Sequence, residues 1–187
     1  RARKHHESET REVVRHVKNG TSVDLVGVRS SGRSTVLRQA RSSLENAGTS
    51  VLAVSGAGPG LPLEALRIAL PPAYRDAAAK AGTTPAALSD AIARYLSDGA
   101  GVTLVDDSDL LDEQSWAVLV HVHRTIGRPL VSSTLRCAPG TSRRRLSTVV
   151  TPVAQVALGE LRLDALHAVL EERVDGSLSP AVSAHIH

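Results

Sequence analysis

Short apolar runs alternate along the chain with longer segments whose apolar residues recur every three or four positions. The short runs, at 22–27, 50–55, 101–106, 129–133 and 153–158, have the length of buried strands. The periodic segments predict helices at 7–19, 33–47, 62–70, 85–96, 113–126 and 163–174. Strands that alternate with helices predict an α/β fold, in which helices cover both faces of a mostly parallel sheet of five strands. Ligands of such sheets bind at the carboxyl ends of the strands.

The first strand leads into a loop with the spacing of a phosphate-binding loop, G-x-x-x-x-G-K-[ST], in which arginine replaces the lysine. The loop consists of Gly27, Val28, Arg29, Ser30, Ser31, Gly32, Arg33, Ser34 and Thr35. Because a helix begins at about Arg33, the loop's backbone N–H groups and the positive end of the helix dipole would face an anion. We predict that this loop binds nucleotide phosphates and that the Ser34 hydroxyl binds Mg²⁺. The alternative is an ordinary polar connection between a strand and a helix.

Two adjacent carboxylates, Asp106 and Asp107, end the strand at 101–106. In P-loop nucleoside triphosphatases an acid at this strand end holds Mg²⁺, and we predict this role for Asp106. The next acid in such proteins orients the attacking water or accepts its proton, and Asp107 occupies that place. The alternative is a solvated Asp-Asp turn, followed by a helix that Asp112 caps.

The strand at 129–133 is followed by Thr134, Leu135 and Arg136. A polar residue at this strand end can contact the attacking water, and an arginine just beyond it can reach the γ-phosphate. We therefore predict a catalytic role for Arg136, against the alternative of an ordinary surface arginine. The three motifs all stand at carboxyl ends of strands, so independent patterns indicate one nucleotide site.

Composition limits the classes of function. The chain has 187 residues, 42% of them hydrophobic, which suits one full-sized core. The only cysteine, Cys137, excludes an internal disulfide, and no run of 18 apolar residues occurs, so we expect a soluble, cytoplasmic protein without a membrane partner. A net charge of +3 and an aromatic content of 2% argue against direct single-strand nucleic-acid recognition. His121 and His123 would point to different faces of their helix, which disfavours a zinc site. Since the chain lacks methionine, we expect it to be a fragment.

Three segments resemble the AAA-type ATPase domains of large LuxR-type transcriptional regulators, which belong to the STAND class of signal-transduction NTPases. Residues 104–115, LVDDSDLLDEQS, resemble the segment VDD-x-x-x-LD-x-x-S of that family. Residues 156–161, VALGEL, resemble the L-x-x-L element after the fifth strand. Residues 4–9, KHHESE, resemble the N-terminal motif x-G-R-E-x-E, which packs near the adenine in that family.

The resemblance, which covers about residues 5–175, implies a three-layer P-loop NTPase sandwich whose C-terminal subdomain is largely missing. It divides the chain into an N-terminal helix of the ATPase module at 1–20 and a nucleotide-binding core at 21–187. It also implies an ATP/ADP-binding switch with Mg²⁺ as its metal. DNA would be contacted only through an attached helix-turn-helix domain outside this chain, and the resemblance leaves homo-oligomerisation on activation open.

Three departures from the family pattern affect the expected activity. Arginine at position 33 replaces the lysine, Asp107 replaces the commoner glutamate, and His5-His6 replace Gly-Arg. The planar guanidinium is longer than an ammonium and does not occupy the same point-charge position. We therefore expect a regulatory ATP-binding domain with weak or slow turnover. The alternatives are a competent ATPase and a non-catalytic interaction scaffold on a degenerate P-loop fold.

Overall fold

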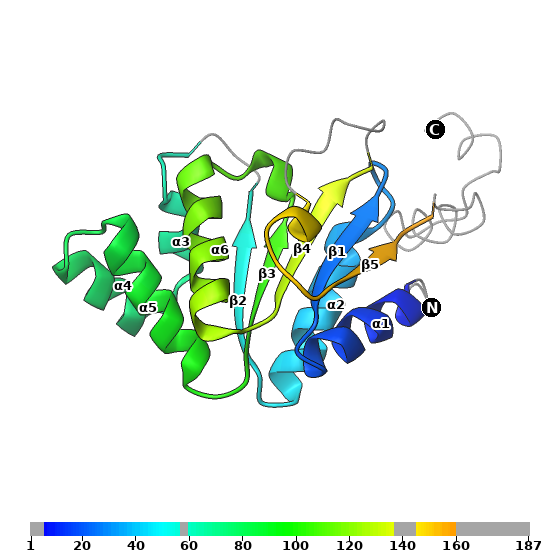
Figure 1. The fold of residues 1–187 in the computed structure, drawn as a ribbon, viewed down its shortest axis with the longest axis horizontal. Helices are drawn as coiled ribbons and strands as arrows, with labels where there is room; N and C mark the ends of the chain where they lie inside the picture. The colour runs from blue at the N-terminus through cyan, green and yellow to red at the C-terminus, as the bar shows by residue number, and fades with distance from the viewer. Residues whose placement is uncertain (1–5, 57–59, 137–144, 160–187) are drawn as a thin grey trace, which may run out of the picture.

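The structure is a computed structural model that describes residues 6–56, 60–136 and 145–159 (Figure 1). Its strands are β1 (Ser22–Gly27), β2 (Ser50–Ser55), β3 (Gly101–Asp106), β4 (Leu130–Leu135) and β5 (Val153–Ala157). Its helices are α1 (Glu7–Lys18), α2 (Arg33–Asn46), α3 (Glu64–Ala69), α4 (Pro72–Lys80), α5 (Pro85–Ser97) and α6 (Glu113–Ile126). Two 3₁₀ turns, η2 (Ser108–Leu110) and η3 (Leu146–Thr148), complete the described elements.

The strands form one five-stranded sheet in the order β2-β3-β4-β1-β5, and all of the described pairings are parallel. The predicted α/β architecture with a five-stranded sheet is therefore confirmed. Strand β1 pairs with β4 on one side and with β5 on the other. This order brings the carboxyl ends of β1, β4 and β3 next to one another at one edge of the sheet (Figure 1).

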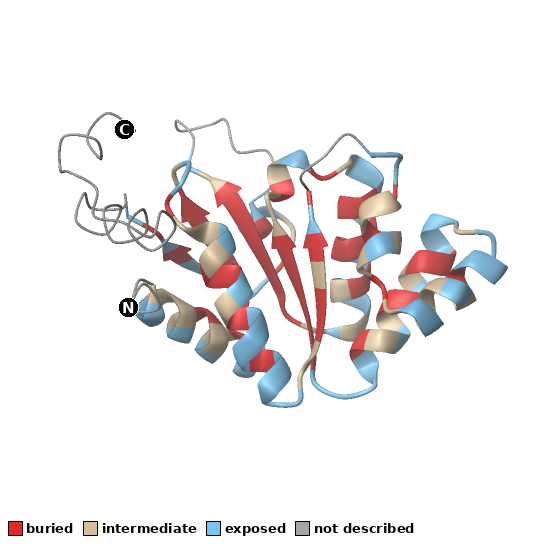
Figure 2. Ribbon diagram, turned by 180° about the vertical axis from the view of Figure 1, so that it is seen from behind, coloured by how far each residue is buried: buried red, intermediate tan, exposed pale blue. Residues whose placement is uncertain are grey.

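Two hydrophobic layers cover the faces of the sheet. Helices α1 and α2 lie on one face, α3, α5 and α6 lie on the other, and α4 packs against α5 (Figure 1). Successive residues of a strand point to opposite faces. Val51 accordingly packs in the α1–α2 layer, and Leu52 packs in the opposite layer. Buried residues run along the strands and the inner sides of the helices, whereas the outer sides are exposed (Figure 2).

Side-chain caps begin two helices at the predicted places. The hydroxyl of Thr84 accepts a 3.2 Å hydrogen bond from the N–H of Ala87, and Pro85 occupies the first turn of α5. Asp112 caps α6, and α6 ends at Gly127, whose φ of 64° suits a residue without a side chain. Over the residues described, none of the helices combines the length and the apolarity that crossing a membrane would require.

The structure corrects some predicted boundaries. Strand β4 continues to Leu135, beyond the predicted end at 133, because Leu135 still pairs with Gly27 of β1. Helix α4 was not predicted, because the predicted helices end at 70, before Pro71-Pro72, and resume at 85. Pro72 instead stands at the start of α4, where a missing N–H removes no helical hydrogen bond. Turn η3 lies between β4 and β5, where no element was predicted. The helix predicted at 163–174 lies outside the described residues.

Candidate functional site

The loop between β1 and α2 depends on two glycines. A Cβ atom on Gly27 would lie 2.2 Å from Oγ of Ser31, so any side chain there would collide with the loop itself. Gly32 has a φ of 90°, a conformation that residues with side chains rarely adopt. It is the N-cap of α2 and provides no side-chain capping hydrogen bond. The first backbone N–H groups of α2 are therefore not satisfied by a cap and are available to an anion.

Three polar atoms around Gly32 are buried and have no hydrogen-bond partner among the described residues. They are Oγ of Ser31, Nη1 of Arg33 and Nε2 of His6. His6 lies directly against the loop, since a Cβ on Gly32 would be 2.3 Å from its Nε2. Burying a polar atom without a partner costs free energy. The loop therefore contains donors that an additional acceptor such as a phosphate oxygen would satisfy.

Arg33 forms an ion pair with Asp107. Nη2 of Arg33 lies 3.1 Å from Oδ1 of Asp107, and the arginine side chain is only 10% exposed. The pair joins the first turn of α2 to the turn after β3, two segments that are more than 70 residues apart in the sequence. The structure thus brings together the residue that departs from the loop pattern and the second residue of the Asp-Asp motif.

Asp106 is held by the neighbouring strand. Its Oδ1 accepts a 2.7 Å hydrogen bond from the hydroxyl of Ser133 on β4 and a 3.1 Å bond from the N–H of Asp107. The N–H of Asp107 also donates to Oγ of Ser133, at 2.9 Å. The two bonds that involve Ser133 tie the ends of β3 and β4 together. Among the described residues no hydrogen bond reaches Oδ2 of Asp106, which leaves that oxygen for a cation.

The main chain of Arg136 lies beside the loop. Its N–H donates a 2.9 Å hydrogen bond to the carbonyl of Gly27, and the residue is exposed. Ser34 is also exposed, on the first turn of α2, and its hydroxyl has no hydrogen-bond partner in the described ranges. All the predicted site residues therefore lie at the carboxyl edge of the sheet. Among them, Arg33 forms an ion pair with Asp107, and the main chain of Arg136 forms a hydrogen bond with that of Gly27.

Sequence reasoning missed the residues that organise the turn after β3. The hydroxyl of Ser108 donates to the carbonyl of Ser133 at 3.1 Å, and Oδ2 of Asp109 accepts from the N–H of Leu135 at 3.0 Å. Turn η2 is thereby fastened to the end of β4. The run Ser132-Ser133-Thr134 in an otherwise apolar strand is the sequence signal that could have indicated this polar contact.

Asp24 is a second residue that the patterns did not single out. It is 4% exposed in the middle of β1, and its Oδ1 accepts a 3.0 Å hydrogen bond from the N–H of Leu146. Burial raises the pKa of Asp24, and the backbone N–H groups of Leu146 and Ser147 oppose that rise. The carboxylate anchors η3 on the face of β1 opposite to the one where Val23 and Leu25 pack in the α1–α2 layer.

The residues at this edge fit a nucleotide carrying phosphates and a divalent cation. The glycines allow close approach of the backbone, the buried Nη1 of Arg33 is a free donor, and Ser34 and Asp106 provide oxygen ligands. Oxygen atoms from hydroxyl and carboxylate groups are the ligands that Mg²⁺ prefers. The fit rests on the loop conformation and on these donors and acceptors.

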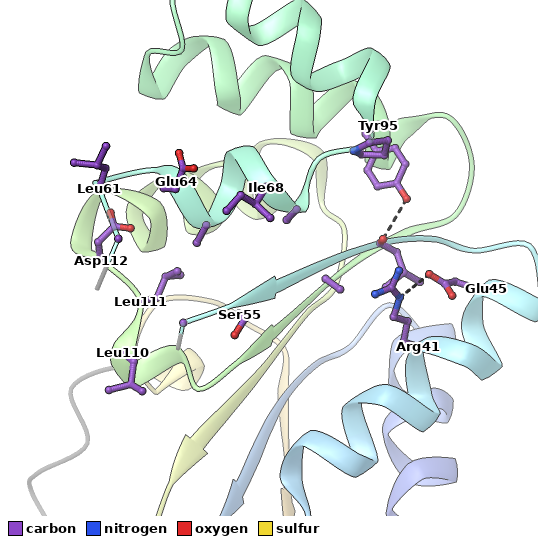
Figure 3. A pocket seen from close by; sticks show the side chains of 17 residues that line it. Arg41, Glu45, Ser55, Leu61, Glu64, Ile68, Tyr95, Leu110, Leu111 and Asp112 are labelled. Atoms are coloured by element: carbon purple, nitrogen blue, oxygen red, sulfur yellow. Dashed lines mark hydrogen bonds and ion pairs between the residues drawn. The ribbon is translucent and has the colours of Figure 1, made fainter. Parts of the chain in front are cut away.

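A groove of about 810 Å³ lies away from the loop, along the edge strand β2 and next to α3 (Figure 3). Val51, Ala53 and Ser55 of β2 contribute to its lining, together with the exposed side chains of Leu61, Ile68 and Leu110. The hydroxyl of Tyr95 donates a 3.1 Å hydrogen bond to the carbonyl of Val51 at one end (Figure 3). Its described lining includes none of residues 27–35, so the groove is separate from the phosphate loop.

Comparisons with known proteins identify the fold. No family model and no curated protein matches the sequence. The structure is similar to a DNA replication initiation factor (TM-score 0.62, 16% identity, 95% of this chain and 53% of that one). It is also similar to AMPPCP-bound DnaA from Aquifex aeolicus (TM-score 0.59, 16% identity, 96% and 54%) and to PCH-2 of C. elegans (TM-score 0.55, 13% identity, 90% and 45%).

These likenesses concern the fold alone, because the identities are 13–16%. The chain spans about half the length of these structures. Together with the parallel sheet in the order β2-β3-β4-β1-β5, they show that the chain has the AAA+-like α/β fold of P-loop ATPases.

Proposed function

We propose that the chain is a regulatory nucleotide-binding domain that binds ATP and ADP with Mg²⁺ and hydrolyses ATP weakly or slowly. One observation carries the proposal. The glycine loop, the Asp-Asp turn and Arg136 come from three different strands and meet at one edge of the sheet, joined by the Arg33–Asp107 pair and the Arg136–Gly27 bond. The AMPPCP bound to the similar DnaA supports the choice of an adenine nucleotide.

Each residue has a role that follows from its chemistry. The backbone of residues 27–35 and the guanidinium of Arg33 hold the phosphates, because both present donors to an anion. Ser34 and Asp106 hold Mg²⁺, which neutralises charge on the phosphates when bound. We assign Asp107, which pairs with Arg33, to the attacking water. We assign Arg136, whose N–H bonds to Gly27 of the loop, to the terminal phosphate.

The Arg33–Asp107 pair also supports slow turnover. An acid that accepts a proton from water needs its carboxylate free, whereas Oδ1 of Asp107 lies 3.1 Å from a guanidinium. The guanidinium therefore occupies a carboxylate oxygen that a water would otherwise contact. The same pair favours the second candidate, a non-catalytic scaffold on a degenerate P-loop fold, in which Arg33 serves only to join α2 to the turn after β3.

We further propose that the domain belongs to a cytoplasmic LuxR-type transcriptional regulator of the STAND class. The resemblance of residues 104–115 to the family's VDD segment supports this assignment. In such a protein the nucleotide state would control an attached helix-turn-helix domain, and homo-oligomerisation would accompany activation. The chain itself would contact nucleotide and not DNA.

Calorimetric titration of the purified chain with Mg-ATP and Mg-ADP tests the proposal, beside Arg33→Lys and Asp106→Ala variants. We expect binding by the wild type and loss of Mg²⁺-dependent binding in Asp106→Ala. Equal affinity of the wild type and Asp106→Ala would contradict the assigned metal site. Binding by Arg33→Lys alone would favour the scaffold, since it would mean that one residue had abolished a nucleotide site.

A further inference from the structure

Arg33 is a buried cation whose hydrogen bonds are only partly used. Its side chain is nine-tenths buried, Nη2 pairs with Asp107, and Nη1 is buried without a partner among the described residues. Removing a guanidinium from water is costly unless an anion lies close to it. In the structure as it stands, Asp107 is the carboxylate that supplies this negative charge.

The backbone of Asp107 is held from several sides. Its φ of 48° is in the left-handed region, and its N–H donates to Ser133 and Asp106. Its carbonyl accepts a 2.9 Å hydrogen bond from the N–H of Leu110. A Cβ on Gly56, at the end of β2, would lie 2.2 Å from that carbonyl oxygen, so the two backbones are in close contact. The carboxylate is therefore presented to Arg33 from a rigid turn.

A phosphate at the glycine loop would approach the same guanidinium. Nη1 of Arg33 is the unused donor of that group, and Oδ1 of Asp107 lies 3.1 Å from its neighbour Nη2. Two anions on one guanidinium repel each other, and the repulsion is strong where water is largely excluded. The phosphate and the Asp107 carboxylate therefore cannot both interact with Arg33 at full strength.

We propose that Asp107 is an internal counter-ion that competes with the nucleotide phosphates for Arg33. The inference rests on the proposed nucleotide-binding function and names the regulation of that site. Nucleotide binding weakens the Arg33–Asp107 pair, which lowers the affinity for nucleotide. The same exchange transmits the state of the loop to the turn at 106–110, because Asp107 is bonded to Ser133 and Leu110. Asp107 thus acts through Arg33 as a positioning residue.

A double-mutant cycle tests the competition. Mg-ATP and Mg-ADP are titrated into the wild type, Asp107→Asn, Arg33→Gln and the double variant, all as the 187-residue chain. Asparagine keeps the shape and the acceptor oxygen of Asp107 but not its charge. We expect Asp107→Asn to tighten Mg-ATP binding by roughly five-fold or more, and expect most of this gain to disappear in the Arg33→Gln background.

Other outcomes overturn the proposal. Equal tightening in both backgrounds would mean that Asp107 repels phosphate directly, without Arg33. Weaker binding by Asp107→Asn would mean that the pair supports nucleotide binding. Unchanged binding would mean that Asp107 does not compete with the phosphates for Arg33. Absence of nucleotide binding in all four proteins would overturn both the proposed function and the competition. If nucleotide binds but the effects of the Arg33 and Asp107 substitutions on affinity are independent, only the competition is overturned.

A variant that unfolds would not report on competition, so the melting temperature of each protein is measured without ligand. If Asp107→Asn does not fold, Asp107→Ser replaces it, because a hydroxyl is also a neutral acceptor. The same double-mutant cycle, measured without ligand as unfolding free energies, is a second test of the Arg33–Asp107 pair. We expect the unfolding free energies of Arg33→Gln and Asp107→Asn to be non-additive, and strict additivity would overturn the pair as a linked unit.

Discussion

Ser133 on β4 donates a 2.7 Å hydrogen bond from its hydroxyl to Oδ1 of Asp106 on β3. The same hydroxyl oxygen accepts a 2.9 Å bond from the N–H of Asp107. One small side chain therefore sets both the orientation of the predicted metal-binding carboxylate and the position of the following residue. Its neighbour Ser132 is equally buried, but its hydroxyl has no partner among the described residues.

These two serines form a matched pair for mutation. Ser133→Ala should destabilise the protein by about 1–3 kcal/mol, because it removes a donor and an acceptor from partly buried partners. Ser132→Ala should be nearly neutral, since it removes a buried hydroxyl that has no partner among the described residues. Urea denaturation of both variants measures the difference. An equal loss in the two variants would show that the Ser133 bonds contribute no stability of their own.

Gly56→Ala should displace the turn that carries Asp107. Its Cβ would meet the carbonyl oxygen of Asp107 at 2.2 Å and the N–H nitrogen of Leu111 at 2.9 Å, and backbone atoms move only with difficulty. We expect a loss of roughly 1–3 kcal/mol in unfolding free energy. Gly60→Ala is the control, because its Cβ would lie 3.8 Å from Glu64 in ordinary contact. If the two variants melt alike, the Gly56–Asp107 contact is looser than described.

The buried carboxylate of Asp24 predicts a pH dependence of stability. Burial raises its folded pKa above the ordinary value of 3.8, so the unfolded chain ionises first as the pH rises. The contribution of Asp24 to stability is therefore full below that value and is lost as the pH rises through the folded pKa. Relative to Asp24→Asn, the wild type should be less stable at pH 7 than at acid pH.

Denaturation at both pH values, with Asp76→Asn on the exposed side of α4 as the control, measures this difference. Asparagine retains an oxygen that can accept from Leu146, so η3 should keep its place. A gap between wild type and Asp24→Asn that does not change with pH would contradict the raised pKa.

Asp112→Ala should cost about 1 kcal/mol by removing the cap of α6. Oδ1 of Asp112 accepts a 2.8 Å bond from the N–H of Ser115, and Oδ2 accepts a 2.6 Å bond from its hydroxyl. Partial burial alone would raise the pKa of Asp112, but the bonds from Ser115 lower it below its ordinary value. The stabilisation is therefore present at neutral pH and is lost as the pH falls through the lowered pKa.

Thermal melts at pH 7 and at acid pH test this sign, with Asp112→Asn as the conservative variant. Asparagine is also a good N-cap, so we expect it to retain most of the stability at pH 7. A difference between the wild type and Asp112→Ala that grows on acidification would contradict the predicted sign.

The amino-acid sequence by itself determined the α/β class, the five strands and the placement of the polar motifs at their carboxyl ends. It could do so because strand length, helical periodicity and capping residues such as Thr84 and Asp112 act locally. The Gly27 and Gly32 spacing likewise follows from the backbone conformation of one short loop. These features depend on interactions between residues a few positions apart, so the local sequence pattern is enough to predict them.

The pairing of side chains was decided only by the tertiary structure. Arg33 meets Asp107, Ser133 meets Asp106, and Asp24 meets Leu146, each across more than 25 residues of sequence. Such contacts depend on the order of strands in the sheet, which places β4 between β3 and β1. Strand order follows from packing the whole core, so no local pattern contains it. For that reason the sequence indicated which residues gather at the loop, and the fold alone decided that Arg33 is bound to a carboxylate.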